Sequence, residues 1–153
     1  MLFRSLMAYV DLVRPALAAH SGVADVVQRG LSFLANLAAH PDNKVPLMAY
    51  VDLVRPALVA HSGVADVGQR GLWFLAGLAG HADNRVPLMA YADLVRPALV
   101  AHSSVADVGT WFLTGLSVQL SNRAILKSDT DLVAVVRSLP SSPLRDALLT
   151  KWT

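Results

Sequence analysis

The segment from Met7 to Leu47 returns almost unchanged from Met48 to Leu88 and begins a third time at Met89. The first two copies differ at only seven positions, and the third copy starts with MAYADLVRPALVAHSSVADVG. A regular period of about 41 residues is typical of tandem-repeat proteins, in which each unit buries its apolar face against its neighbours. We therefore predict a single repeat domain over residues 1–153. Its parts are repeats at about 7–47, 48–88 and 89–126 and a degenerate cap at 127–153.

The composition narrows the classes of function. Apolar residues make up 54% of the chain and charged residues 16%, below the roughly 25% of ordinary soluble domains. The longest uncharged apolar stretch, Gly30 to Ala39, is far shorter than the roughly 20 residues that cross a membrane, so we expect no membrane insertion. The absence of cysteine excludes disulfides and thiolate metal ligands. The net charge of +2 is spread along the chain, whereas nucleic-acid binding needs clustered basic residues.

The N-terminal residues follow the repeat pattern. SLMAYVDLVRP at residues 5–15 matches part of VPLMAYVDLVRP at residues 45–56, so we interpret this stretch as structure rather than as a signal peptide. We expect an intracellular, cytoplasmic protein, with the nucleus as an alternative. In the later copies, the corresponding residues follow the long helix of the preceding copy, on which the repeat packs. No such helix precedes Leu2, Phe3 and Leu6 in this sequence. We expect them to form an exposed apolar patch that favours self-association.

Each period divides into three predicted helices. The second and third helices of the first copy cover residues 11–20 and 23–40, and the next short first helix covers 42–50. Leu31, Leu34, Leu37 and Ala38 recur at helical spacing and are predicted to face the core, with Gly30 beside them where a neighbouring helix approaches. No part of the period alternates with the two-residue rhythm of a strand. The predicted fold class is therefore all-α.

Aspartates mark the predicted helix starts. Asp11 and its equivalents Asp52 and Asp93 are predicted to cap the second helices, because a side-chain oxygen accepts a hydrogen bond from a free N–H group of the first turn. Asp42 and Asn43 are predicted to cap the short first helix in the same way. A negative side chain also suits the positive end of the helix dipole. We therefore assign these carboxylates to capping rather than to catalysis.

The third copy is shorter than the others. GQRGLWFL in the second copy becomes GTWFL in the third, so the step from Trp73 to Trp111 is three residues shorter than the repeat. Three residues are close to one helical turn, and we expect a shorter long helix whose later face is rotated by only about 60°. After Leu120 the pattern decays into a worn first and second helix. Ser142 and Pro143 then predict the start of a last amphipathic helix that closes the stack.

The segments LSFLANLAAHPDN and LWFLAGLAGHADN, in a three-helix period of roughly 40 residues, resemble the armadillo repeat. The resemblance covers the first two copies well, the third copy with its deletion, and the tail weakly. It implies an armadillo-like right-handed α-α superhelix, or solenoid, of about three repeats with a C-terminal helical cap. It also implies a concave groove lined by the third helices, where armadillo proteins bind extended peptides.

In peptide-binding armadillo proteins a tryptophan packs on peptide side chains, and an asparagine four residues later holds the peptide backbone. The pair is incomplete in every copy of this chain, which has in turn Ser32 and Asn36, Trp73 and Gly77, and Trp111 and Gly115. An exposed tryptophan beside an arginine is typical of binding hot spots, and Arg70 precedes Trp73 by three residues. The resemblance therefore implies a protein-binding groove of a general kind.

We predict a non-enzymatic module that binds a protein or an extended peptide and uses no cofactor. The five histidines have no metal-binding spacing, and they are predicted to cap helix C-termini or to face solvent. No catalytic or metal-ligating residue is predicted. The predicted partner-binding residues are Gln28, Arg29, Ser32, Asn36, Gln69, Arg70, Trp73, Gly77, Trp111 and Gly115.

Two alternatives remain open. One is a structural, self-associating segment of a larger solenoid, whose repeats stack on further repeats and which should oligomerise in light scattering. The other is nucleic-acid binding by the row Arg14, Arg55 and Arg96, which should give salt-sensitive retention on heparin. We interpret this row instead as a solvated face, with Asp11 and its equivalents three residues earlier as partners on the same side.

Overall fold

A computed structural model describes residues 6–153, and these residues form helices, turns and bends without a strand. The prediction of an all-α fold is confirmed. The elements are η1 (Val10–Leu12), α2 (Val13–Ala19), α3 (Ala24–Ala38), η2 (Pro41–Asn43), η3 (Pro46–Leu53), α4 (Val54–Ala60), α5 (Ala65–Leu78), α6 (Ala82–Leu88), η4 (Met89–Leu94), α7 (Val95–Ala101), η5 (Ser103–Val105), α8 (Ala106–Ser117), α9 (Leu120–Ser128), α10 (Thr130–Ser138) and α11 (Pro143–Trp152).

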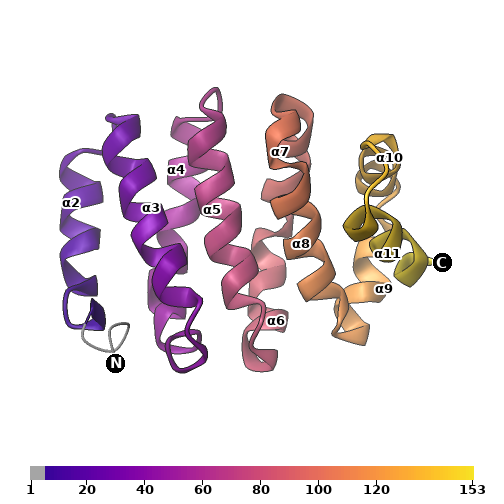
Figure 1. Cartoon of the computed structure of the whole chain (residues 1–153), viewed down its shortest axis with the longest axis horizontal. Coiled ribbons are helices and arrows are strands. Elements are labelled where there is room, and N and C mark those ends of the chain that lie inside the picture. The colour runs from indigo at the N-terminus through magenta and orange to yellow at the C-terminus, as the bar shows by residue number, and fades with distance from the viewer. Residues whose placement is uncertain (1–5) are drawn as a thin grey trace.

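The helices are arranged in a row from the N-terminal to the C-terminal end (Figure 1). The long helices of the three copies, α3, α5 and α8, lie side by side across one face, with α5 packed between the other two. The helix α11 packs on α8. Because each long helix contacts the long helix of the next copy, one surface of the molecule is built from equivalent residues of all three copies.

Leucines of the long helices form the core between copies. Leu31 and Leu34 of α3 are fully buried, and so are Leu72 and Leu75 of α5. Each pair is three residues apart, so both side chains lie on the same face of their helix. The predicted core face of the first long helix is therefore confirmed, and the same face is buried in the second copy.

Two glycines allow the second helices to approach the long helices. A Cβ atom at Gly30 would lie 2.7 Å from Cδ2 of Leu17, and a Cβ atom at Gly71 would lie 2.4 Å from Cδ1 of Leu58. Side chains in a packed interior do not come this close, so a larger residue at either position would force the Leu17 or Leu58 side chain to move. The predicted close approach at Gly30 is confirmed.

The deletion in the third copy shortens the long helix as predicted. The helix α8 has 12 residues, whereas α3 has 15. A Cβ atom at Gly109 would lie 3.1 Å from Cδ2 of Leu99, so Gly109 has the place in α8 that Gly71 has in α5. The missing residues therefore precede Gly109. As a result, Asp107 and Val108 occupy the turn where α5 has a glutamine and an arginine.

The predicted aspartate caps of the second helices are wrong. The N-caps of α2 and α4 are Leu12 and Leu53, and neither makes a side-chain capping bond. A 3₁₀ helix runs directly into each α-helix, and the carbonyl groups of that preceding turn accept the first N–H groups, as Val10 accepts from Val13. The carboxylates at positions 11 and 52 are therefore free for contacts with other parts of the chain.

The predicted short helix from Asp42 consists of two 3₁₀ segments in the second copy. These segments, η2 and η3, begin with Pro41 and Pro46 at their first positions, where the missing N–H group costs least. The capping side chain is His40, whose Nδ1 accepts a hydrogen bond from the Asp42 backbone N–H at 3.2 Å. The prediction of Asn43 as an N-cap is wrong, because this residue is buried and binds the end of α3 instead.

The predicted last helix is confirmed. It begins at Pro143, and the hydroxyl of Ser142 accepts a hydrogen bond from the Arg145 N–H at 3.1 Å. Near its end Trp152 is buried, and its Nε1–H donates to Oγ of Ser117 in α8 at 3.0 Å. The helix α11 therefore covers part of α8, and α9 and α10 form the worn first and second helix that the sequence indicated.

Most of the predicted apolar patch lies outside the residues that the structure describes. Leu2 and Phe3 are outside the described residues, and Leu6 is half-buried against the core.

The sequence also predicted that the chain does not insert into a membrane. Within residues 6–153, no helix combines the length and the apolar character that crossing a membrane requires.

Candidate binding surface

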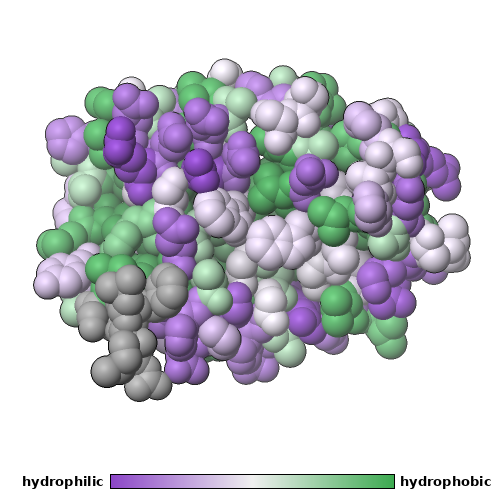
Figure 2. Space-filling model, viewed as in Figure 1, coloured by the Kyte–Doolittle hydropathy of each residue, from purple (hydrophilic) through white to green (hydrophobic). Residues whose placement is uncertain are grey.

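The predicted binding residues lie along α3, α5 and α8. Eight of the ten line two hollows, and Gly77 and Gly115 line neither. We call the first the polar hollow; it is lined by Asp25, Gln28, Arg29, Ser32, Phe33 and Asn36. We call the second the tryptophan cleft; it is lined by Gln69, Arg70, Trp73, Ser104, Asp107, Val108, Trp111 and Leu144. Figure 2 shows that the face over these helices mixes hydrophilic and near-neutral side chains, without a continuous apolar stripe.

The tryptophan cleft has a volume of about 600 Å³ and is formed by three helices. On the α5 side, the guanidinium of Arg70 lies over the ring of Trp73, 5.3 Å from its centroid. Trp73 is half-buried and packs against the core, whereas Trp111 on α8 is 43% exposed. Leu144 from α11 adds a third apolar wall. Two tryptophans and a leucine therefore surround a space that is open to a ligand.

Arg70 is held in place by its contact with the ring of Trp73. A guanidinium over the face of an aromatic ring is attracted by the ring's quadrupole, by about 0.5–1 kcal/mol at an exposed site. Its Nε is buried without a hydrogen-bond partner among the described residues. A guanidinium with unused donors matches the two oxygens of a carboxylate. The cleft thus joins an aromatic surface to a site suited to an acidic group.

The polar hollow on α3 has a different chemistry. Ser32 stands where α5 and α8 carry tryptophan, so the aromatic ring of this hollow is the half-buried Phe33. Arg29 and Asn36 are exposed, and Gln28 and Ser32 are half-buried. The four predicted residues of the first copy do come together, around a space of about 490 Å³. They supply hydrogen-bonding groups, and the apolar side chain beside them is that of Phe33.

Gly77 and Gly115 lie at contacts between successive long helices rather than in either hollow. A Cβ atom at Gly77 would lie 3.3 Å from Cβ of Ala38, and a Cβ atom at Gly115 would lie 3.1 Å from Cβ of Ala79. Both glycines therefore lie where one long helix crosses the end of the preceding one. The equivalent Asn36 in α3 is exposed. A side chain at Gly77 or Gly115 would therefore press against the preceding long helix, which would have to move by a few tenths of an ångström.

The arginine row links neighbouring copies. Arg14 and Arg55 each bind an aspartate of the following copy, and Arg96 contacts Asp131 at 3.3 Å. The prediction that these arginines pair with the aspartate three residues earlier is therefore wrong, although the partner type is the expected one. Because all three guanidinium groups have carboxylate partners, the row does not present a free positive stripe to a phosphate backbone.

A second set of contacts between copies was not predicted from the sequence. These contacts are hydrogen bonds from the asparagine of a repeated Asn-Lys or Asn-Arg pair. Asn84 is buried, and its Nδ2 donates to the carbonyls of Leu78 and Lys44, both at 2.9 Å. Asn122 makes the same two contacts, with Leu116 and Arg85. Each asparagine thus binds the end of its own long helix and the segment that follows the long helix of the preceding copy. The signal was present in the sequence as Asn43-Lys44, Asn84-Arg85 and Asn122-Arg123.

The basic residue of this pair donates hydrogen bonds to backbone carbonyl groups at the C-terminal ends of helices. Lys44 Nζ donates to the carbonyls of Ala38 at 2.7 Å and Gly77 at 2.8 Å, so one ammonium binds the C-terminal turns of both α3 and α5. Cations favour the negative end of the helix dipole. Burial nevertheless lowers the pKa of Lys44 below its usual value. Its role is to stabilise the contact between two copies.

His20 is exposed at the end of α2, as predicted, whereas other histidines make contacts that the prediction did not include. Nδ1 of His81 accepts the Asp83 N–H at the start of α6, so it caps the N-terminus of a helix. His61 and His102 follow α4 and α7, and their Nε2 atoms donate to the carbonyls of Ser21 and Ser62 in the preceding copy. Among the described residues, no three His, Cys, Asp or Glu side chains are grouped so that they could hold a metal ion.

Comparisons with known proteins add no further constraint. No family model, no curated protein and no solved structure matches the chain. The inferences about this surface therefore rest on its residues and their geometry.

Proposed function

We propose that the chain is an armadillo-like, right-handed helical solenoid and a non-enzymatic module that binds an extended segment of a partner protein in the tryptophan cleft. The observation that supports this most directly is the stacking of Arg70 on Trp73 in the wall of the cleft. The Arg70 side chain makes no ion pair within the described residues, and Trp111 supplies a second, more exposed ring. Exposed aromatic residues beside arginine are typical of binding hot spots.

The chemistry of the cleft defines the partner. An apolar or aromatic side chain of the partner packs on Trp73 and Trp111, and an acidic side chain next to it pairs with Arg70. The asparagine positions that hold a peptide backbone in armadillo proteins are here the packed glycines at 77 and 115. The hold on the partner backbone is therefore weak, so we expect a modest affinity and a loose register.

Selection from a library of random displayed peptides, with the purified chain as bait, tests the proposal. We expect enriched peptides to combine an acidic residue with an aromatic or large aliphatic residue. Trp111→Ala should weaken the best peptide by roughly thirtyfold, which corresponds to about 2 kcal/mol for the loss of an aromatic anchor. Arg70→Gln should weaken acidic peptides more than their amide analogues.

Two variants serve as controls. Trp111→Phe keeps an aromatic ring and should retain most of the affinity, whereas Leu120→Ala removes an exposed apolar side chain outside the cleft and should change nothing. Enrichment of peptides without this composition, or unchanged binding by Trp111→Ala, would place the partner on another face. Light scattering on the same sample tests the alternative, because a self-associating segment would form oligomers without any peptide.

A further inference from the structure

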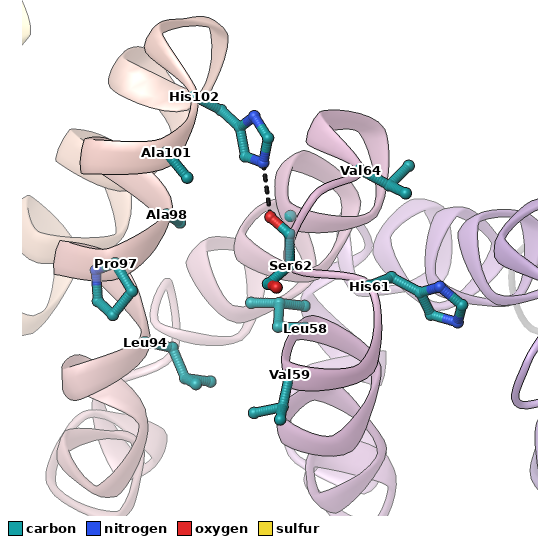
Figure 3. Close-up of a pocket in the computed structure, with 11 residues that line it drawn as sticks. Leu58, Val59, His61, Ser62, Val64, Leu94, Pro97, Ala98, Ala101 and His102 are labelled. Atoms are coloured by element: carbon teal, nitrogen blue, oxygen red, sulfur yellow. Dashed lines mark hydrogen bonds between the residues drawn. The ribbon is translucent and has the colours of Figure 1, made fainter.

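A pocket of about 280 Å³ lies between the second helices of the second and third copies, away from the tryptophan cleft. Figure 3 shows Leu58 and Val59 of α4 on one side and Leu94, Pro97, Ala98 and Ala101 from the other copy on the opposite side. The residues that line it are Leu58, Val59, His61, Ser62, Val64, Gly68, Leu94, Pro97, Ala98, Ala101 and His102. None of them carries a permanent charge.

The first and second copies differ at one position that explains the pocket. Val27 of α3 is buried, with 3% of its surface exposed, and its equivalent in α5 is Gly68. A Cβ atom at Gly68 would have a single neighbour within 4 Å, Cγ1 of Val105 at 3.9 Å. The space that a valine side chain fills in the first copy is therefore empty in the second.

The connection after α7 contributes to the opening. His102 has extended backbone angles, φ −141° and ψ 107°, whereas the equivalent His61 has φ −119° and ψ 38°. The segment that follows is a short 3₁₀ turn, η5, instead of the serine-glycine turn of the earlier copies. Ala98 in α7 is half-buried, whereas its equivalent Ala57 in α4 is buried. The wall formed by α7 is thus less covered than the corresponding wall of the first interface.

Both histidines at the edge of the pocket already have hydrogen-bond partners. Nε2 of His102 donates to the Ser62 carbonyl at 2.8 Å, which joins the two copies at the edge of the pocket (Figure 3). His61 points away from α7, and its Nε2 donates to the Ser21 carbonyl at 2.7 Å. The Nε2 donors of both histidines are committed, the exposed Ser62 hydroxyl is the other polar side-chain group, and the remaining walls are aliphatic. The pocket therefore disfavours an ion or a strongly polar molecule, which would lose hydration without enough compensation.

We propose that this pocket binds a small, uncharged aromatic molecule, of the size of naphthalene or indole. Its volume is roughly twice the ~150 Å³ of an apolar cavity that accepts benzene. The driving force is the removal of apolar surface from water on both the ligand and the aliphatic walls. This site is independent of the tryptophan cleft, which lies on the face built by the long helices.

The test uses the full chain, with naphthalene and indole as probes. Methyl resonances of Leu58, Val59, Val64 and Leu94 are recorded during a titration, together with the melting temperature. We expect saturable shifts confined to these methyl groups and a rise in melting temperature. Gly68→Val, which restores the residue of the first copy, should weaken binding at least tenfold. The matched control Gly63→Val makes the same change where no atom lies within 4 Å and should bind as the parent does.

A second variant keeps the test decisive if Gly68→Val folds poorly. Ala101→Leu adds bulk from the exposed side of α7, and it should also weaken binding at least tenfold while the helical circular-dichroism signal stays unchanged. The proposal is wrong if the parent shows no saturable shifts at these methyl groups, or if shifts appear instead at Trp73 and Trp111. It is also wrong if a folded variant with a filled pocket binds both probes as tightly as the parent.

Discussion

Arg14 of α2 donates hydrogen bonds to both carboxylate oxygens of Asp52, at 2.7 and 2.9 Å, and a third to the carbonyl of Ala49 at 2.8 Å. Its guanidinium also lies over the ring of Tyr50, 5.4 Å from the centroid. One side chain of the first copy thus contacts three residues of a single turn in the second. The same set recurs one copy later between Arg55 and the turn that contains Asp93.

This arrangement predicts a small effect of breaking one ion pair. In Asp93→Asn the guanidinium of Arg55 keeps its bond to the Ala90 carbonyl and its position over Tyr91, and both partners are largely exposed to water. We expect the free energy of unfolding to fall by less than about 1 kcal/mol. Urea unfolding of the parent and the variant, at low and at high salt, measures this difference in free energy. A loss of several kcal/mol would show that the pair governs the interface between copies.

The same pairs predict a pH dependence. The hydrogen bonds from Arg14 and Arg55 hold the pKa values of Asp52 and Asp93 below their ordinary value of 3.8. An acid with a lowered pKa in the folded state stabilises the fold fully above its ordinary pKa, and this contribution is lost as the pH falls through the lowered value. Thermal unfolding should therefore show stability falling below about pH 4. The double variant Asp52→Asn with Asp93→Asn should flatten that fall, and an unchanged slope would contradict the assignment.

The buried asparagines predict a larger effect than the ion pairs. Asn84→Ala removes two hydrogen bonds, to the carbonyls of Leu78 and Lys44, whereas Asn43→Ala removes a single one, to Leu37. A hydrogen bond within a protein contributes about 0.5–1.5 kcal/mol to stability. We expect Asn84→Ala to destabilise the protein more than Asn43→Ala, by about 1 kcal/mol or more. Denaturant titration of both variants measures this, and equal losses would show that the contact between copies contributes little.

Because the long helices cross at Gly77, we predict that a substitution there destabilises the protein more than one at the equivalent Asn36. Gly77→Asn, which introduces the residue of the first copy, forces a side chain against Ala38 and should cost about 1–3 kcal/mol by overpacking. The reverse change, Asn36→Gly, acts on an exposed position of α3 and should cost less than about 1 kcal/mol. The two melting temperatures decide the matter. If Gly77→Asn melts at or above Asn36→Gly, the two helices do not meet at Gly77 as described.

The two tryptophans should differ in what they contribute to stability. Trp73 is half-buried and packs against the core, so Trp73→Ala removes packing and should lower the melting temperature. Trp111 is 43% exposed, and Trp111→Ala should leave the melting temperature closer to that of the parent. Differential scanning calorimetry of both variants tests this order. Trp111 is therefore the better position for the binding experiment. If Trp111→Ala instead melts at a lower temperature than Trp73→Ala, Trp73 is the better position.

Much of the local structure followed from the sequence. The regular repeat placed the second helices, and the apolar spacing of Leu31, Leu34 and Leu37 identified the buried face of α3. The shortened α8 and the start of α11 at Ser142-Pro143 were also predicted correctly. These features depend on residues close together in the chain, and helical geometry alone relates their positions.

The partners of the interface residues could not be read in the same way. In a chain of near-identical copies, Arg14 has one aspartate three residues before it and the equivalent aspartate in the next copy. Spacing alone cannot decide between a partner in the same copy and an identical residue in the next. Only the placement of α2 against the following copy selects Asp52 over Asp11.

The candidate site shows the same division between sequence and tertiary structure. The sequence placed Arg70, Trp73, Trp111 and the first-copy residues on a common face, and these residues do line two hollows there. It placed Gly77 on that face as well, because a helical pattern specifies a side of the helix but not the line along which a neighbouring helix crosses it. That crossing is set by how closely two backbones approach, and the approach depends on side chains from both copies at once.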